Sequence, residues 1–410
     1  MECPIKPKPR TCPLLATIGV ALLAALLSYG VGAASPDLEL GVEYQFFPQK
    51  AAAGRDNYSA DQYAYASLGW DQYFADQRWL VEFDGYLGWD RHDENRQRAD
   101  LRTLALSYYA DRFDVKIGFA TEFWGVTESR HLVDILNQTS VADNIDEEVK
   151  LGQPMLKWQT HQDWGNLQLF WLPGFRERVF AAPGARLNPA LPIDASRSRY
   201  ASGAEDKHQD VALRYAHTLG AWDLGLAYFR GTSREPLLDP KFNAAGELVL
   251  SPYYEQIEQT SLDLQRTGAG LLLKLEAIQR HGSRQGSYHA LVSGFEFTQV
   301  GVFGSAMDLG YIAEYLYDQR GEQATTTFQN DLFLGLRLAA NNIAQTSLLL
   351  GVYHDRKTSG QALRLELNTR LRDDLVLELE GQAFRNLADT DLLHGFRNDD
   401  YLRASLKFYF

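Results

Sequence analysis

Cysteine is nearly absent from this chain of 410 residues. The only two, Cys3 and Cys12, lie close to the N-terminus. Residues 35–410 therefore have no disulfide, no thiolate ligand for a metal and no cysteine nucleophile. The same residues contain no apolar run long enough to cross a bilayer as a helix. If this part of the chain enters a membrane, it must do so as a closed β-barrel, the other structure that satisfies every backbone group in lipid.

Basic residues are scarce relative to acidic ones. The chain holds 40 lysines and arginines against 53 acidic residues, which gives a formal net charge of −13. Nucleic acid is bound through basic surfaces, so this balance argues against a nucleic-acid partner.

The N-terminus has the pattern of a secretory signal peptide. A basic region, an apolar run and a group of small residues follow one another: Lys6, Lys8 and Arg10, then 14–27, then 31–34. This order predicts cleavage near Ala33 or Ala34 and export of residues 35–410. Removal of residues 1–34, which hold three basic residues and one acidic residue, lowers the formal net charge from −13 to −15.

The exported part of the chain alternates apolar and polar residues with a period of two. In the last ten residues, YLRASLKFYF, the apolar residues from Leu402 to Phe410 share one face. Leucine alternates with charged or polar residues in the same way in 331–338, 363–371 and 375–383. A charged face repeated in most strands does not fit a packed soluble core, but it fits a wide barrel with a watery lumen.

These patterns predict an all-β fold, a transmembrane antiparallel up-and-down β-barrel of about 18 strands, with about 16 as the alternative. The predicted strands are 37–47, 62–74, 77–89, 99–110, 112–123, 151–161, 165–173, 207–219, 221–231, 254–266, 269–280, 286–300, 302–317, 325–339, 345–355, 360–371, 375–386 and 398–410. Short periplasmic turns alternate with long outer loops, as such barrels require. Residues 35–410 are thus predicted to form one barrel domain in the outer membrane of a Gram-negative cell.

Aromatic residues lie beside most of the short turns. They are Phe74, Trp79, Tyr109, Phe113, Trp164, Trp222, Phe303, Phe408 and Phe410. In a barrel these residues converge into a girdle at the lipid interface. We therefore predict contact with outer-membrane lipids and lipopolysaccharide, and assembly by the barrel-assembly machinery through the strand that ends in Phe410. Homo-oligomer formation stays open.

The segment FWGVTESRHLVDILNQTS, residues 123–140, interrupts the alternation. Its apolar residues have a helix-like spacing: Leu132, Val133, Ile135 and Leu136. We predict a short helix that Thr127 or Ser129 caps and Asn137 ends, with Gly125 letting the chain leave the strand at an angle. The segment belongs to the third outer loop, 124–150. Its apolar side needs cover, which packing against the barrel wall supplies.

An inward fold of this loop would create a pore constriction. The loop carries the candidate acids Glu128, Asp134, Asp146, Glu147 and Glu148. The predicted wall positions opposite carry the candidate bases Lys157, Arg214, Arg364 and Arg403. Acids facing bases would set up a transverse field that orients polar solutes and sets ion preference. The alternative is an ordinary loop helix that lies on top of the barrel.

Two other charged stretches have plainer interpretations. The stretch DNIDEE, 143–148, lacks the glycine and ligand spacing of an EF-hand, so a solvated acidic loop is favoured over a calcium site. Loop 174–206 carries five arginines, for which contact with lipopolysaccharide, an anionic substrate and a stiff folded loop all stay open. They are Arg176, Arg178, Arg186, Arg197 and Arg199.

No catalytic motif accompanies the histidines. The nine are His92, His131, His161, His208, His217, His281, His289, His354 and His394. His161 with Asp163, and His289 with nearby serines, come nearest to a hydrolase site, and neither has a nucleophile elbow or HExxH spacing. We predict no enzyme activity, no cofactor and no metal.

The chain resembles general and substrate-specific porins. The resemblance rests on strand number, loop alternation, the terminal Phe410 and the position of loop 124–150. A looser likeness joins it to a group of Gram-negative barrels in which Trp-Gly at a strand end precedes a short helix ending in Asn, here Trp124-Gly125 and Asn137. A proline follows that Asn in the group, whereas this chain has Gln138.

The resemblance implies a channel for passive diffusion of small polar solutes or ions, constricted by the third outer loop. The first alternative is a substrate-specific uptake or export barrel for a polysaccharide or an apolar compound, working with periplasmic partners. A non-conducting structural or adhesive barrel and an outer-membrane hydrolase are further alternatives.

Overall fold

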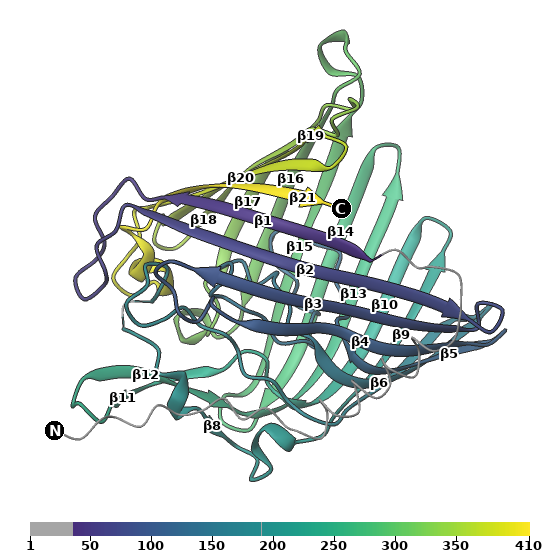
Figure 1. Cartoon of the computed structure of the whole chain (residues 1–410), viewed down its shortest axis with the longest axis horizontal. Helices are drawn as coiled ribbons and strands as arrows, with labels where there is room; N and C mark the ends of the chain where they lie inside the picture. Colours follow the sequence, from purple (N-terminus) through teal and green to yellow (C-terminus); the bar gives the residue numbers. More distant parts are fainter. Residues whose placement is uncertain (1–35, 190) are drawn as a thin grey trace. The chain divides into compact units, whose positions relative to one another are not determined.

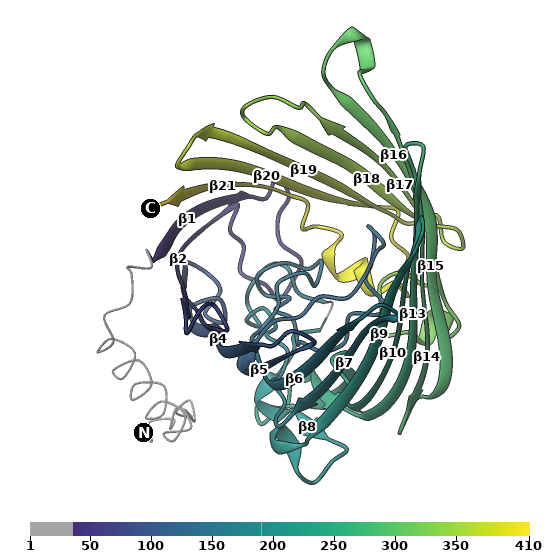
Figure 2. The same ribbon diagram turned by 90° about the vertical axis from the view of Figure 1, so that its right-hand side faces the viewer.

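The computed structural model describes residues 36–189 and 191–410. Within them, 18 strands form one antiparallel sheet that closes into a barrel (Figures 1 and 2). Each barrel strand pairs with its neighbours in the chain, and the first strand pairs with the last from Glu39↔Tyr409 to Phe46↔Leu402. The predicted fold and strand number are therefore confirmed, and the alternative of about 16 strands is wrong. The predicted signal peptide, 1–34, with its two cysteines lies outside the described residues.

The barrel strands agree with the predicted ones in order and number. They are β1 (Asp37–Phe46), β2 (Ala60–Phe74), β3 (Trp79–Asp90), β4 (Ala99–Tyr109), β5 (Phe113–Ala120), β6 (Gln153–Gln162), β7 (Gly165–Leu172), β9 (Asp210–Leu219), β10 (Trp222–Thr232), β13 (Gln256–Gly268), β14 (Leu271–Gly282), β15 (Gly286–Gln299), β16 (Asp308–Asp318), β17 (Asn330–Ala339), β18 (Ser347–Asp355), β19 (Gln361–Arg372), β20 (Leu375–Arg385) and β21 (Tyr401–Tyr409). The largest difference in a boundary is at β16, which begins six residues later than predicted because a turn containing the 3-10 helix Val302–Gly304 precedes it.

The two faces of the sheet differ in polarity. Apolar side chains such as Leu40, Ile117, Leu336 and Leu402 are exposed on the outside. On the inner face, Glu276 and other charged side chains are buried, because loops fill much of the interior. An apolar outer face with a polar inner face is typical of a barrel in a lipid bilayer.

Both ends of the barrel sequence meet at the short-turn end. Phe410 and Leu38 exchange backbone hydrogen bonds of 2.9 and 3.3 Å. Several of the aromatics beside the short turns are exposed, including Trp164 at 53% and Phe303 at 88%. The long connections all leave the opposite end of the barrel.

A small second sheet, which we did not predict, is built from two of the long outer loops. Its strands are β8 (Arg199–Tyr200), β11 (Leu237–Phe242) and β12 (Leu248–Tyr254). β11 and β12 form an antiparallel hairpin, and β8 adds to β12 in parallel. Among the described residues, no helix is long and apolar enough to cross a membrane.

Candidate pore constriction

Residues 121–152, which connect β5 to β6, run through the interior of the barrel. We call them the constriction segment. Gly125 turns the chain inward with a φ of +149°, in the region that favours glycine. A Cβ at this position would come within 2.8 Å of His131 Nδ1 and 3.0 Å of Glu276 Oε1. The absence of a side chain at Gly125 therefore lets the backbone come close to the wall of β14.

Glu276 on β14 binds the start of the constriction segment. One of its carboxylate oxygens accepts hydrogen bonds from the backbone N–H of Val126 (2.7 Å) and Thr127 (3.0 Å) and from the Thr127 hydroxyl (2.8 Å). The other oxygen accepts one from the Val133 N–H at 3.2 Å. A carboxylate that accepts several backbone N–H groups makes strong, charge-assisted bonds. Glu276 thus fixes two separate turns of the segment.

Glu314 on β16 does the same for the next residues. Its carboxylate accepts hydrogen bonds from the N–H of Glu128 (2.9 Å), the N–H of Ser129 (2.8 Å) and the Ser129 hydroxyl (2.6 Å). The Tyr353 hydroxyl donates to the Ser129 carbonyl at 3.0 Å. Side chains from three strands, β14, β16 and β18, therefore hold the segment to the wall.

The constriction segment does not contain the predicted helix, so that prediction is wrong. Its apolar residues are nevertheless buried against the wall, as predicted. Val133, Ile135 and Leu136 are at most 2% exposed, in a cluster that includes Phe229 and Ile278 of the inner wall. None of the described residues in 121–152 is helical. Several of the N–H groups that a helix would pair internally are bound by the wall carboxylates instead.

Asn137, predicted to end the helix, instead joins the two ends of the constriction segment. Its side-chain amide donates to the carbonyls of Ala120 and Leu151, both at 2.9 Å. Its carbonyl oxygen accepts from the Glu122 N–H at 2.9 Å. A buried side-chain amide that satisfies three backbone groups acts as a local clamp.

The structure brings together one set of the predicted acids and bases. Arg364 Nη2 lies 3.2 Å from Glu148 and 3.8 Å from Asp146, and its Nε also contacts Glu366 on the same strand. This group joins the constriction segment to β19, as the predicted pairing of loop acids with wall bases requires.

The other predicted acids have different partners. Glu128 pairs with Arg337 at 2.5 Å, and Glu147 pairs with Arg178 of the next outer loop at 2.9 Å. Asp134 pairs with Lys150 inside the segment itself. None of Arg337, Arg178 and Lys150 was among the four predicted bases of the constriction, although Arg178 is one of the five arginines noted in loop 174–206.

The three remaining predicted bases do not face the predicted acids. Lys157 pairs with Glu122 at 2.9 Å, Arg403 pairs with Glu380, and Arg214 pairs with Asp263 at 2.7 Å. Arg214 and Asp263 line a separate cavity of about 340 Å³ near the short turns.

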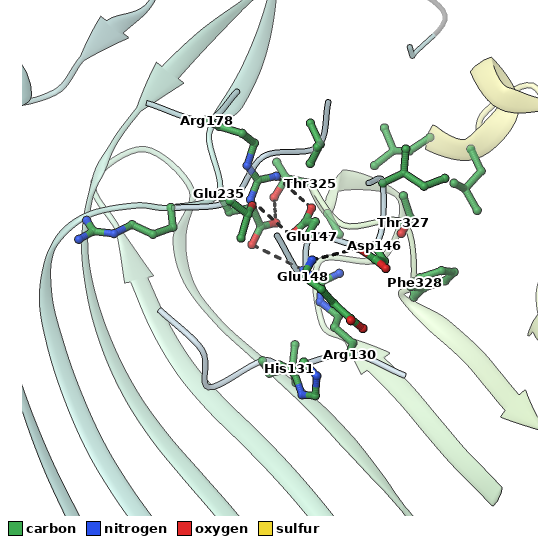
Figure 3. A pocket seen from close by; sticks show the side chains of 18 of the residues that line it. Arg130, His131, Asp146, Glu147, Glu148, Arg178, Glu235, Thr325, Thr327 and Phe328 are labelled. Carbon is green, nitrogen blue, oxygen red and sulfur yellow. Dashed lines mark hydrogen bonds and ion pairs between the residues drawn. The ribbon is translucent and has the colours of Figure 1, made fainter. Parts of the chain in front are cut away.

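A larger cavity, which we call the chamber, lies on the outer-loop side. It has a volume of about 660 Å³. Its lining includes all five predicted acids and Arg364, together with residues from four outer loops. In Figure 3, Glu147 and Glu148 lie close together with Arg130 just below them, and Glu235 and Thr325 face each other beside them. The chamber thus combines charged side chains with a larger apolar lining that includes Phe328 and Tyr353.

Several functional side chains of the chamber were missed from the sequence. Arg130 belongs to the constriction segment. Arg280 is on β14, Tyr288 is on β15, and Arg320 lies in the loop after β16. They surround Glu235, which follows β10. No local pattern marks these residues, because they converge only in the closed barrel.

The other charged stretches make specific ion pairs. Asp143 pairs with Arg98, and Asp146, Glu147 and Glu148 pair with Arg364 or Arg178, although Glu147 and Glu148 stay exposed to solvent. In loop 173–209, Arg186 is fully buried against Asp399. The stiff folded loop is thus the alternative that the contacts favour. His161 contacts Asp114 and Asn166 rather than Asp163, and no group of His, Cys, Asp or Glu suited to a metal occurs among the described residues.

Asp146 gives the chamber a pH dependence. Burial, with Glu148 nearby, raises the pKa of Asp146 to about 7. We expect cation preference to increase between pH 6 and 8, as Asp146 goes from about one-tenth to about nine-tenths ionised. Because this folded-state pKa lies above the unfolded value, Asp146 stabilises the folded loop at low pH and loses that contribution as the pH rises through about 7. Reversal potentials across this range provide the test, and Asp146→Asn should abolish most of the change. If reversal potentials of Asp146→Asn changed with pH as those of the wild type do, Asp146 would not be the titrating group.

No protein-family model matches the chain, and no curated protein matches it. Solved structures do share its fold. Wzi of Escherichia coli, described as an outer-membrane protein involved in group 1 capsule assembly and as a carbohydrate-binding β-barrel, aligns with a TM-score of 0.54 and 11% identity over 98% of this chain and 90% of Wzi. OccK11 (OpdR) of Pseudomonas aeruginosa aligns with a TM-score of 0.54 and 14% identity over 92% and 95%. The chain therefore has the fold of outer-membrane β-barrels, which agrees with the predicted resemblance and location.

Proposed function

We propose that the protein is an outer-membrane channel through which small polar solutes and ions diffuse, and that the constriction segment narrows its lumen. The observation that supports this most is the attachment of the segment to distant parts of the inner wall. Glu276 and Glu314 hold its first half, while Asn144 reaches Glu380 on β20 at 3.2 Å and Arg403 on β21 donates to the Asp143 carbonyl at 3.1 Å. A segment fixed in this way leaves a restricted path lined with charge, and such a lining sets selectivity.

The charged side chains of the constriction segment should then control ion preference. We expect Glu128→Lys and Glu148→Lys to move the reversal potential toward anions, and Arg364→Glu to move it toward cations, because each change reverses one charge in the path. The measurement is planar-bilayer recording of the refolded mature chain in a salt gradient. Glu322→Lys, in an exposed outer loop, is the matched control. Unchanged selectivity in all three variants would contradict the proposed path.

A substrate-specific uptake barrel is the second candidate. The aromatic lining of the chamber favours it, since Phe328 and Tyr353 stack there with centroids 4.2 Å apart. An exposed aromatic face binds flat or ring-shaped ligands, sugars included. Block of the current by a panel of oligosaccharides and aromatic compounds separates this candidate from a general diffusion channel. Lipopolysaccharide contact, recognition by the barrel-assembly machinery and homo-oligomer formation remain proposals.

A further inference from the structure

A group of three arginines surrounds one carboxylate at the edge of the chamber. Arg280 lies 3.0 Å from Glu235, Arg320 lies 3.5 Å from it, and Arg130 lies 3.9 Å from it. The three come from β14, from the loop after β16 and from the constriction segment. Burial alone would raise the pKa of Glu235, but the three guanidinium groups hold it well below its usual range. The group therefore carries more positive charge than Glu235 neutralises.

Part of this excess is already compensated. Arg320 forms bonds of 3.0 and 2.7 Å to the Asp318 carboxylate, and Arg280 donates to Gln259 at 2.7 Å. Among the residues that the structure describes, Arg130 has no such close partner, because its 3.9 Å contact with Glu235 is beyond hydrogen-bond range. Arg130 is thus free to bind another acceptor.

A second, independent observation points to a ligand at this place. The Tyr288 side chain lines the chamber and is only 3% exposed, yet its hydroxyl has no hydrogen-bond partner among the described residues. Arg320 stacks on the Tyr288 ring at 3.8 Å. A buried hydroxyl without a partner costs stability. An acceptor group in the chamber would remove that cost.

An apolar surface lies beside the arginines. The Tyr353 hydroxyl donates to the carbonyl of Ser129, the residue before Arg130, and the Tyr353 ring stacks on Phe328. Thr325, three residues before Phe328, donates to Glu235. The same part of the chamber thus offers an anion site and an aromatic surface.

We propose that the chamber binds a small organic carboxylate that carries a flat apolar ring. Its carboxylate is held by Arg130 and the Tyr288 hydroxyl and competes with Glu235 for Arg280, while its ring lies against Phe328, which the buried Tyr353 supports from the other side. The inference rests on the proposed function, because the ligand enters and leaves through the channel.

The test is calorimetric titration of the refolded mature chain with phenylacetate, its neutral isostere phenylacetamide, and acetate. We expect saturable binding of phenylacetate. Phenylacetamide and acetate should bind more weakly by roughly tenfold or more, because phenylacetamide lacks the carboxylate and acetate lacks the ring. Equal affinity for phenylacetate and phenylacetamide, or no binding of phenylacetate, would overturn the proposal.

Variants separate the site from effects on folding. Tyr288→Phe removes only an unpaired buried hydroxyl, so we expect a thermal unfolding temperature at or above that of the wild type, with affinity for phenylacetate lowered by roughly fivefold or more. Arg130→Gln should weaken binding, and Glu235→Gln should strengthen it by removing the competing charge. Tyr228→Phe and Arg91→Gln, at exposed positions outside the chamber, are the matched controls. Wild-type affinity in Tyr288→Phe would contradict the assigned site.

Conductance recorded in parallel separates this inference from the proposed function. A channel that conducts ions but does not bind phenylacetate would leave the proposed function intact and remove the inference. A protein that binds phenylacetate but never conducts would remove the proposed function and leave a binding barrel.

Discussion

A chain that carries both Glu276→Gln and Glu314→Gln will conduct more current than the wild type and will switch among several open levels. Each carboxylate accepts at least three hydrogen bonds from the constriction segment. A glutamine has one acceptor oxygen, and its amide N–H groups would face backbone donors. Bonds to a charged group are worth about 1.5–3 kcal/mol each, so the loss of several shifts the segment toward displaced states by roughly a hundredfold or more.

Single-channel recording in planar bilayers provides the measurement. Glu322→Gln in an exposed outer loop is the control, because its carboxylate pairs only with the exposed Lys357 among the described residues. The double variant must still form heat-modifiable barrels, which band shifts on electrophoresis can verify. A folded double variant with wild-type conductance and steady current would show that these glutamates do not hold the bore in its narrow state.

The second large effect concerns residues 179–189, which we call the strap because they cross from the β7 side to the loops of β1 and β21. Arg186 anchors the strap and is fully buried. Its guanidinium binds Asp399 at 2.8 Å and donates to the carbonyls of Gln49, Tyr58 and Asn398. We expect Arg186→Met to release the strap, because the three carbonyls lose their buried donor at a cost of about 1–3 kcal/mol for each group left unsatisfied, and Asp399 keeps only Arg55 as an ion-pair partner.

Thiol labelling can measure this release. Residues 35–410 contain no cysteine, so Ala182→Cys, at a position that is 6% exposed within the strap, supplies one buried reporter. Maleimide should react slowly with this reporter alone and faster by at least about tenfold when Arg186→Met is added. Arg197→Met, at an exposed arginine of the same outer loop, is the control. Equal labelling rates with and without Arg186→Met would refute the anchoring role.

The barrel was predictable because its determinants are local. Alternation places Leu402 and its neighbours on the lipid side, and the short turns separate one strand from the next. The outer sheet of β8, β11 and β12 was not predictable, since β8 has only two residues and β11 and β12 each contain a proline and do not alternate cleanly. Such strands depend on partners from other loops.

The candidate site was only partly predictable for the same physical reason. The sequence places Arg364 and Lys157 on the inner face, but it does not specify which acids face them. The predicted helix failed because helical spacing of apolar residues shows only that they need burial. The backbone N–H groups of Val126 and Ser129 find their acceptors 150 and 185 residues away in the sequence, so no local pattern could reveal them.

These long separations also have a consequence for the order of folding. The constriction segment follows the fifth of 18 strands, but its hydrogen bonds to β14, β16, β18, β20 and β21 span from 143 to 260 residues of chain. Closing such long loops is entropically costly and slow, and the partners must be in place first. The segment can reach its final position only after β14 to β21 have assembled. A barrel that has not yet joined β1 to β21 would therefore have an unobstructed interior, and narrowing of the lumen would be among the last events of its maturation.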